Sequence, residues 1–381
     1  MLDNYTPSWM DEDLAQFREA VRRYTKDYLE PTDVEWRENK QASREAWLKA
    51  GELGLILPDL PEEYGGAGVS AAYAAVVIHE VAYTGNTGLG IGMNHIVGHY
   101  IARFGTEEQK KRWLPGMASG EIIAAVAMTE PGTGSDLQGV RTKADKVDGK
   151  YVINGSKIFI SNGQMCDMVL VVAKTDATQG AKGISLIIVD CNTPGFRRGK
   201  ALDKIGLEGQ DTSEMFFDDC TVPADCLLGG KEGMGFYQLT EQLAYERAQI
   251  AIWAAAAQQR AFELTVEYAK ERKAFGKALI EFQNTRFVLA EVKATVTASR
   301  TFADLIIQKW ADGTLDASTA SMGKFWLTDR QCEVVDKCLQ LFGGYGYMRE
   351  YPIARMYADA RVQRIYGGTN EIQRELVGRL L

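Results

Sequence analysis

Residues 151–160 read YVINGSKIFI, a stretch rich in the β-branched and aromatic residues that favour β-strands. Asn154-Gly155 in its middle is typical of a two-residue hairpin turn, so we expect two strands that reverse direction there. Three similar short runs follow, at Met168–Val172, Ile184–Val189 and Glu214–Phe217. Several short strands without helical segments between them predict a small β-sandwich or β-barrel.

The chain before this β-region has the hydrophobic period of helices. Five apolar residues recur at steps of three and four in the first segment: Leu14, Phe17, Val21, Tyr24 and Tyr28. Pro31 is expected to end that helix, because proline breaks a helix interior. Further helices are predicted at Ser43–Leu55, Ala71–Tyr83 and Glu107–Met117.

The helical period returns after about residue 235, in longer segments. These are Leu239–Arg272, with Gly276 as a stop signal just past it, Phe282–Trp310, Ser318–Leu341 and Ile353–Ile365. Four such segments are enough for a helix bundle. We therefore predict an α+β protein with a helical domain over 1–120, a β-domain over 121–232 and a four-helix bundle over 233–381.

Length and charge limit the class of protein. A chain of 381 residues favours two to three domains, and a net charge of −8 argues against a nucleic-acid binder. No apolar run approaches the roughly 20 residues of a membrane helix. The acidic opening at Asp11, Glu12 and Asp13 is unlike a signal or transit peptide, so we expect a cytoplasmic protein without a membrane span.

Several kinds of site are excluded or disfavoured. The sequence has no G-x-G-x-x-G, no complete P-loop and no G-x-S-x-G motif. His95 and His99 could share one helix face as half a metal site, but no Glu or His at helical spacing completes the set. We therefore expect helix packing or pocket lining there, and no metal. Six cysteines without a C-x-x-C motif indicate reduced, structural thiols.

The stretch Met128–Asp136 (MTEPGTGSD) is more informative. Gly132 and Gly134 allow a ligand to approach the backbone closely, and the hydroxyl groups nearby can form hydrogen bonds. Taken alone it could be an ordinary β-turn. Together with Phe159-Ile160-Ser161, an aromatic beside a hydroxyl, it suits a flat polar ring such as an isoalloxazine.

These blocks resemble the acyl-CoA dehydrogenase family, flavoproteins that oxidise the α–β bond of fatty acyl-CoA thioesters in fatty acid β-oxidation. The matching blocks follow the family's order: Met128–Asp136, Asn154–Gly163, Glu271–Gln283, Gln340–Tyr347 and Ile365–Gln373. The resemblance implies FAD as cofactor. It also implies the family fold, with an N-terminal helical domain, a middle β-domain and a C-terminal four-helix bundle, which agrees with the α-β-α order.

The resemblance also implies which residues contact the flavin. Those from the β-domain are Met128, Thr129, Ser135, Phe159 and Ser161, with Phe159 and Ser161 where the family usually has Trp and Thr. Arg272, Phe275 and Gln283 match contacts that a neighbouring subunit makes to the FAD diphosphate and adenosine, which an arginine fork suits. Taken alone, Arg272 could be a solvated helix end. Gln340, Gly344, Thr369 and Glu371 complete the set.

Family members place the catalytic base at one of two positions in the sequence. Many family members carry it as glutamate in a Tyr-Glu-Gly-Thr motif, but residues 366–369 here read Tyr-Gly-Gly-Thr. Long-chain and isovaleryl-CoA dehydrogenases place it on a bundle helix instead, and the resemblance then assigns it to Glu246, in the pair Glu246-Arg247. Glu246 shares an apolar helix face with Ile250 and Trp253, so it forms either an internal ion pair or the wall of a cavity.

The implied reaction removes the α-proton to Glu246 while the β-hydride goes to N5 of the flavin. Burial is expected to raise the pKa of Glu246 toward the working pH. The Gly367 N–H, with a flavin ribityl hydroxyl, polarises the thioester carbonyl in the family. The resemblance assigns substrate contacts to Ser135, Tyr237, Arg247 and Gly368.

Residues 366–372 are most similar to the long-chain dehydrogenases, so we expect a long-chain or medium-to-long acyl-CoA substrate. Gly88, Gly90 and Gly92 fall where the family's acyl pocket is deep, unless they serve helix packing. Branched-chain, isoprenoid or isovaleryl-CoA substrates remain alternatives. So do a flavin-dependent oxidase or monooxygenase and a non-catalytic acyl-CoA-binding homologue. The resemblance implies electron-transferring flavoprotein as acceptor and a homotetramer built as a dimer of dimers.

Overall fold

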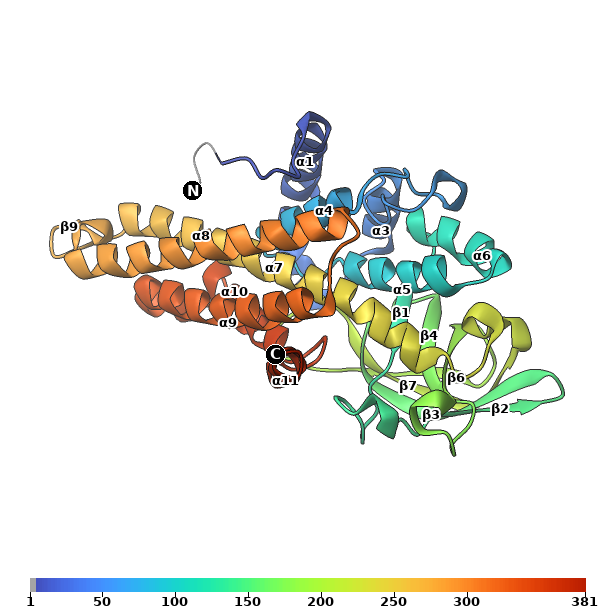
Figure 1. Cartoon of the computed structure of the whole chain (residues 1–381). Helices are drawn as coiled ribbons and strands as arrows, with labels where there is room; N and C mark the ends of the chain where they lie inside the picture. Colours follow the sequence, from blue (N-terminus) through green and yellow to red (C-terminus); the bar gives the residue numbers. More distant parts are fainter. Residues whose placement is uncertain (1–4) are drawn as a thin grey trace.

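A computed structural model describes residues 5–381, and its elements fall into three regions in chain order (Figure 1). The first region is helical: α1 (Glu12–Tyr24), the π-helical turn η1 (Thr25–Leu29), α2 (Glu30–Asn39), α3 (Arg44–Glu52), α4 (Ala71–Thr84), α5 (Ile91–Phe104) and α6 (Glu107–Ala118). Ser43, Ser70 and Thr106 cap α3, α4 and α6 by accepting backbone N–H groups with their hydroxyls.

The prediction that Pro31 ends the first helical segment is wrong. Pro31 lies in the first turn of α2, where a missing N–H removes no helical hydrogen bond. The chain therefore continues from α1 through η1 into α2, and the helical path ends only at Lys40, whose φ is 60°.

The second region is a β-domain. It contains β1 (Ala124–Ala127), β2 (Lys143–Val147), β3 (Lys150–Ser161), β4 (Met168–Lys174), β5 (Ile184–Asp190), β6 (Phe196–Ala201) and β7 (Thr212–Pro223). They form one seven-stranded sheet, in which β1, β4 and β5 make one part and β2, β3, β7 and β6 the other. A single pair, Lys143 with Lys174, joins the two parts.

The prediction of a turn at Asn154-Gly155 is wrong. Residues 150–161 form one continuous strand, β3, and Asn154-Gly155 marks a register shift in its pairing with β7. The reversal lies at Asp148-Gly149, where both residues have positive φ (49° and 75°) and Val147 pairs with Lys150. Both dipeptides suit a hairpin turn, and pairing of β2 with β3 selects the earlier one.

The third region is a helix bundle (Figure 1). It consists of α7 (Gly235–Glu271), the small hairpin β8–β9 (Lys273–Ala274 and Lys277–Ala278), α8 (Gln283–Ala311), α9 (Ala317–Phe342), α10 (Pro352–Ala360) and α11 (Asn370–Gly378). Gly276 lies in the turn of the β8–β9 hairpin. The fourth predicted segment is shorter than expected, because α10 ends at Ala360 and a 3₁₀ turn follows it.

Helix α7 connects the regions. It packs against α4 and α5 from the first region and against α8 and α9 of the bundle. The α+β architecture predicted from the sequence is confirmed. None of the helices described within residues 5–381 combines the length and hydropathy needed to cross a membrane.

A buried charge cluster joins all three regions around Arg37 of α2. Its guanidinium donates to Asp33 Oδ1 at 2.9 Å and to Asp359 Oδ2 at 2.7 Å, and the arginine is 8% exposed. Asp359, on α10, also accepts the backbone N–H of Leu207 from the β-domain at 2.5 Å. Arg37 therefore pairs with two buried carboxylates, of which Asp33 also pairs with Arg355 at 3.1 Å and Asp359 ties the bundle to the β-domain.

We predict that Arg37→Leu destabilises the protein by about 3–5 kcal/mol, because it leaves the buried Asp359 without its cation and leaves Asp33 with Arg355 alone. Denaturant unfolding followed by circular dichroism measures the change. The matched control is Arg103→Leu, which removes an ion pair whose side chains are 50% and 38% exposed. That control should cost no more than about 1 kcal/mol, and equal losses in the two variants would contradict the prediction.

Candidate active site

Glu246 is a buried carboxylate in the first half of α7. It is 7% exposed, and its Oε1 accepts a hydrogen bond from the Tyr100 hydroxyl of α5 at 2.9 Å. Across the described residues, no Lys, Arg or His lies within the 4.0 Å limit of an ion pair with this carboxylate. Of the two environments expected for it, an internal ion pair or the wall of a cavity, the ion pair is not found among the described residues.

Burial raises the pKa of Glu246 to about 7. The Tyr100 hydroxyl and the nearby Arg247 guanidinium both favour the carboxylate and limit the rise. The rise in pKa that the sequence predicts is therefore confirmed, and its cause is desolvation. A carboxyl with a pKa near neutrality can accept and release a proton at physiological pH.

The Gly367-Gly368 turn packs against α7 at Ile250, one helical turn after Glu246. A Cβ added at Gly367 would lie 2.4 Å from Cδ1 of Ile250, which is four residues after Glu246 on α7. Both glycines have positive φ, 64° and 83°. A side chain at position 367 would therefore need both a disfavoured backbone conformation and a displaced isoleucine.

Side chains fix the carbonyl groups of this turn. Lys324, fully buried on α9, donates to the Gly368 carbonyl at 2.8 Å and to Asn370 Oδ1 at 2.9 Å. Gln373 donates to both glycine carbonyls, at 3.1 and 3.2 Å. Among residues 5–381, no backbone carbonyl accepts the N–H of Gly367. The turn is thus held by its carbonyls, and this N–H remains free to donate.

The Met128–Asp136 loop is anchored by a buried ion pair. Lys157 Nζ lies 2.9 Å from Glu130 Oε1 and donates to the Met128 carbonyl at 3.1 Å. The Thr129 carbonyl accepts the N–H of Ile158 at 3.0 Å. The loop and β3 are therefore neighbours, as the flavin interpretation requires, while Ser135 lies exposed further along the loop.

Phe159 is held in an unusual conformation. Its φ is 62°, it lies at a break in the pairing of β3 with β7, and its ring is 64% exposed. A bulky residue with positive φ costs about 1–3 kcal/mol, and such strain concentrates at ligand sites. Ser161, two residues on, is partly buried. The pair presents an open aromatic surface beside a hydroxyl.

Two contacts link this surface to Glu246 through α5. Asn162 donates to the Gly90 carbonyl at 3.3 Å, and a Cβ at Gly90 would meet the Asn162 side chain at 2.1 Å. A Cβ at Gly92 would lie 3.3 Å from Gln249 on α7. Gly88 is equally crowded, by Trp36 at 2.6 Å. Gly88 and Gly90 therefore serve close packing, the alternative to an open acyl pocket.

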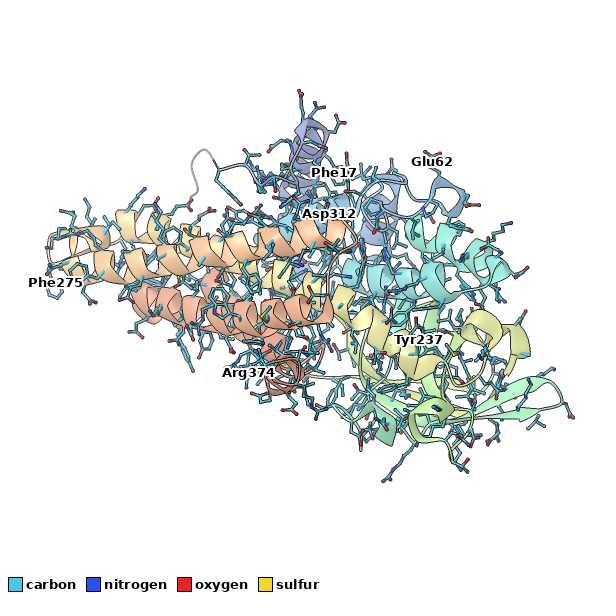
Figure 2. The ribbon with its side chains drawn as sticks, in the orientation of Figure 1. Phe17, Glu62, Tyr237, Phe275, Asp312 and Arg374 are labelled. Atoms are coloured by element: carbon cyan, nitrogen blue, oxygen red, sulfur yellow. The ribbon has the colours of Figure 1, made fainter. Side chains whose placement is uncertain are left out.

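The remaining predicted site residues lie in different parts of the structure. Tyr237 is 49% exposed near the start of α7, at the end facing the β-domain (Figure 2). Thr369 caps α11, and Glu371 in the next turn is exposed. Arg247 is 6% exposed, and its Nη1 contacts Ser321 of α9 at 3.4 Å. The guanidinium of Arg247, to which the resemblance assigns a substrate contact, therefore lies beneath the surface of this chain.

Five predicted cofactor residues lie at the opposite end of the bundle: Arg272, Phe275, Gln283, Gln340 and Gly344. Arg272, Gln340 and Gly344 line an open cavity of about 530 Å³, whose walls also include Tyr268 and Tyr345. Phe275, at the hairpin tip, is 96% exposed (Figure 2). Arg272, the C-cap of α7, is 26 positions after Glu246, which is about 39 Å along the helix at 1.5 Å per residue. One chain does not bring these two groups together.

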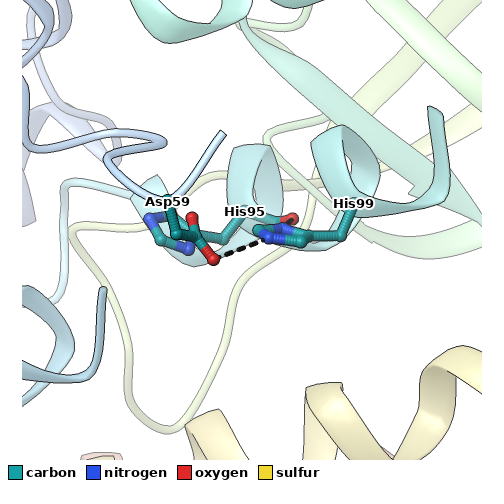
Figure 3. Close-up of side chains that lie close together, drawn as sticks. All are labelled: Asp59, His95 and His99. Atoms are coloured by element: carbon teal, nitrogen blue, oxygen red, sulfur yellow. Dashed lines mark hydrogen bonds and ion pairs between the residues drawn. The ribbon is translucent and has the colours of Figure 1, made fainter. Parts of the chain in front are cut away.

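A second polar cluster lies on α5 just before Tyr100 in the sequence. His95 and His99 of α5 meet Asp59 from the loop after α3, and His99 Nε2 lies 2.9 Å from Asp59 Oδ2 (Figure 3). Burial lowers the pKa of His95 to about 4. Burial also disfavours the charged form of His99, but Asp59 outweighs it and raises the pKa of His99.

Sequence reasoning missed Tyr100, Lys324 and Asp59. Each is far from its partner in the sequence, and no local motif contains it. Only the helical spacing of His95 and His99 gave a signal, and that signal could not identify a third partner from a distant loop.

Three family descriptions match the chain in order. The N-terminal domain of acyl-CoA dehydrogenase matches residues 11–121, the middle domain residues 125–220 and the C-terminal domain residues 233–381.

The chain is also similar to curated proteins over nearly its full length. It is 48% identical over 366 residues to "Long-chain specific acyl-CoA dehydrogenase, mitochondrial" of Sus scrofa, covering 95% of this chain and 85% of the relative. It is 34% identical over 375 residues to "Isovaleryl-CoA dehydrogenase, mitochondrial" of Oryza sativa subsp. japonica, covering 97% and 91%.

Solved structures share the fold. An acyl-CoA dehydrogenase from Geobacillus kaustophilus matches with a TM-score of 0.96 and 44% identity, covering 98% of this chain and 99% of that one. A chain from work on the electron transferring flavoprotein of Acidaminococcus fermentans gives 0.94 and 34%, covering 98% and 99%. A glutaryl-CoA dehydrogenase from Mycobacterium smegmatis in complex with FADH2 gives 0.91 and 28%, covering 97% and 95%.

We predict that Tyr100→Phe raises the pKa of Glu246 further. The hydroxyl donates to the carboxylate and so stabilises its charged form, and removing it favours the protonated form. The carboxyl band in infrared difference spectra measures this pKa, with Glu246→Gln identifying the band. Tyr64→Phe is the control, because Tyr64 donates to Glu107 instead. An unchanged or lower pKa in Tyr100→Phe would show that the hydrogen bond contributes nothing.

Proposed function

The chain belongs to the acyl-CoA dehydrogenase family, oxidoreductases that act on the CH–CH bond of acyl-CoA, and we propose that it oxidises long-chain acyl-CoA with Glu246 as the base. The observation that carries the proposal is the buried Glu246 carboxyl, with a pKa raised to about 7, on the helix α7 against which the Gly367-Gly368 turn packs at Ile250. This chain has Gly367 at the position where many family members carry the catalytic glutamate.

Glu246 removes the α-proton of the thioester. In its apolar surroundings the carboxylate is poorly solvated, which raises its affinity for a proton. It forms no ion pair among the described residues that would hold it in the charged form. The Tyr100 hydroxyl orients it through Oε1. The other carboxylate oxygen then has room to accept the proton, and the neutral acid that results is favoured by the same burial.

The Gly367 N–H donates to the thioester carbonyl. Charge develops on that oxygen as the α-proton leaves, so a fixed donor there stabilises the transition state, typically by about 3–4 kcal/mol. Lys324 and Gln373 hold the neighbouring carbonyls and therefore keep the peptide groups of the turn from rotating. They act on the reaction by positioning the turn and have no contact with substrate in this proposal.

The family is FAD-dependent, and the residues of this chain fit the cofactor. Phe159 offers an exposed ring and Ser161 a hydroxyl. A Cβ added at Gly132 or Gly134 would meet no atom of the described chain within 4 Å, so the loop leaves space for a ligand. FAD supplies the hydride acceptor for the oxidation. Met128, Thr129, Ser135, Thr369 and Glu371 are the further contacts that we propose from the family's motifs.

The residues at the far end of the bundle are proposed to act on a second copy. Arg272, Phe275 and Gln283 are exposed there and match the family's contacts from a neighbouring subunit. The guanidinium of Arg272 beside a 530 Å³ cavity suits a diphosphate, with Gln340 and Gly344 lining the same wall. We therefore propose a homotetramer, a dimer of dimers, in which each chain completes a partner's cofactor site.

The acyl chain is proposed to be long or medium-to-long. The 48% identity with a relative named as long-chain specific supports this, and the 34% identity with an isovaleryl-CoA dehydrogenase keeps the branched substrates as the alternative. Tyr237 is proposed to line the entrance, beside Ser135 and Gly368.

Of three further proposals, only the electron acceptor rests on the resemblance alone. Electron-transferring flavoprotein is the proposed acceptor. The cytoplasm is the proposed location, although the Sus scrofa relative is named as mitochondrial. The boundaries 1–120, 121–232 and 233–381 are the proposed domain limits.

We predict that Glu246→Gln keeps its yellow FAD and binds acyl-CoA but loses turnover by about 10²- to 10⁴-fold, because glutamine cannot accept a proton. Steady-state kinetics and flavin bleaching on addition of acyl-CoA measure the loss. Glu241→Gln, an exposed position on the same helix, is the matched control and should retain full activity. Near-normal activity in Glu246→Gln would refute the assignment of the base.

The pH profile provides an independent check. A base acts only when deprotonated, so kcat/KM of the unaltered enzyme should rise with pH up to about 7 and then level off. Residual activity of Glu246→Gln should lack this ascending limb. A limb of the same midpoint in both proteins would assign it to another group.

We predict that kcat/KM increases with acyl length across saturated thioesters and is highest among the long chains. Comparing C4 to C18 acyl-CoA and branched thioesters measures the preference. A maximum at C4–C6 or with isovaleryl-CoA would reject the long-chain assignment and leave the reaction type intact.

A further inference from the structure

Asp59, His95 and His99 form a cluster that takes no part in the proposed reaction. Each residue offers one ligand atom, and these atoms all lie within 4.8 Å of one another (Figure 3). His95 and His99 are one turn apart on α5 and so share a face of the helix. Asp59 reaches them from the loop that follows α3, so the cluster joins two elements of the N-terminal region.

The cluster is shielded from solvent. His95 is fully buried, and the side chains of Asp59 and His99 are 7% and 17% exposed. Two of its polar atoms, His95 Nε2 and Asp59 Oδ1, have no hydrogen-bond partner anywhere in residues 5–381. Buried polar atoms without partners are uncommon in folded proteins, and two in one cluster require an explanation.

The hydrogen bonds of the cluster leave His95 Nε2 without a partner, whereas His99 Nε2 lies 2.9 Å from Asp59 Oδ2 and 3.2 Å from the Tyr245 hydroxyl, contacts that a bound ion would replace. His99 Nδ1 lies 2.7 Å from the His95 carbonyl, so its Nδ1–H is donated to backbone and Nε2 faces Asp59. His95 Nδ1 lies 3.3 Å from the Tyr245 hydroxyl, which leaves its Nε2 unengaged. Metal-binding histidines are generally held in this way, by one ring nitrogen, while the other binds the ion.

We propose that Asp59 and the Nε2 atoms of His95 and His99 bind one divalent transition-metal ion, with zinc favoured. Two imidazoles and a carboxylate are donors that Zn²⁺ accepts readily, whereas Mg²⁺ and Ca²⁺ prefer oxygen ligands alone. Three protein ligands leave one tetrahedral position. The Tyr245 hydroxyl, 2.8 Å from His99 Nδ1, is a neighbouring polar group at the cluster.

The ion would join the loop at Asp59 to the middle of α5. Tyr100, the next residue after His99, donates to Glu246. The site would therefore hold the segment that carries the hydroxyl partner of the base. The site does not depend on the proposed function, because its ligands and its test involve neither the flavin nor acyl-CoA.

The experiment uses the full-length, FAD-loaded protein, freed of metal with a chelator and titrated with Zn²⁺. Calorimetry and elemental analysis should find about one Zn²⁺ per chain. His99→Gln and Asp59→Asn should each weaken binding by at least about tenfold, since loss of even an outer partner of a metal ligand has that effect. His79→Gln is the matched control, because His79 is the third histidine of the sequence and contacts Glu80 and Arg300 instead.

Two further measurements keep the test decisive if a variant folds poorly. X-ray absorption of the unaltered Zn²⁺ protein should show two imidazole ligands and no sulfur. Co²⁺ in place of Zn²⁺ should give the visible bands of a tetrahedral ion without the charge-transfer band of a thiolate. Absence of stoichiometric binding, equal affinity in His99→Gln and His79→Gln, or sulfur ligation would each overturn the proposal.

Discussion

Helix α7 must be enclosed on nearly every side, and this requirement organises the rest of the molecule. Its buried residues include alanines around most of its circumference, so no single face can serve as a solvent-exposed one. Helices α4, α5, α8 and α9 provide the cover, from two different regions of the chain. The same enclosure removes water from Glu246, so the packing that stabilises the fold also sets the pKa of the proposed base. Burial of α7 therefore both stabilises the fold and raises the pKa of Glu246.

A second buried charged residue, Lys324, holds the Gly367-Gly368 turn beside α7. Lys324 is fully buried, and burial lowers its pKa to about 7, yet its ammonium is satisfied by the carbonyl of Gly368 and by Asn370. The cost of burying the amine is offset only if the turn stays in place. Positive φ at both glycines and the contact of Gly367 with Ile250 disfavour a side chain at position 367. In the proposed site, a carboxylate on α7 and a glycine turn are therefore complementary.

The sequence predicts the helices and strands well where a long hydrophobic period exists, as along α7, α8 and α9. It fails where two local signals compete. Pro31 breaks a helix interior but is tolerated in a first turn, and only the packing of α1, η1 and α2 distinguishes the two cases. Asn154-Gly155 and Asp148-Gly149 carry the same turn chemistry, and the register of the sheet selects one. Glu246 is a prediction that rests on a motif lacking its carboxylate and on the family resemblance, whereas Tyr100, Lys324 and Asp59 make contacts between distant segments that no motif contains.

The length of α7 also limits what one chain can do alone. Glu246 and Phe159 belong to one end of the molecule, and Arg272 lies about 39 Å further along the helix axis. A helix cannot shorten, and the open cavity beside Arg272 is lined by that chain's own α7 and α9. If both ends hold parts of the same dinucleotide, as the family's motifs imply, the two parts must come from different copies. The length of one rigid helix and the chemistry of its two ends therefore support the second copy in the proposed assembly.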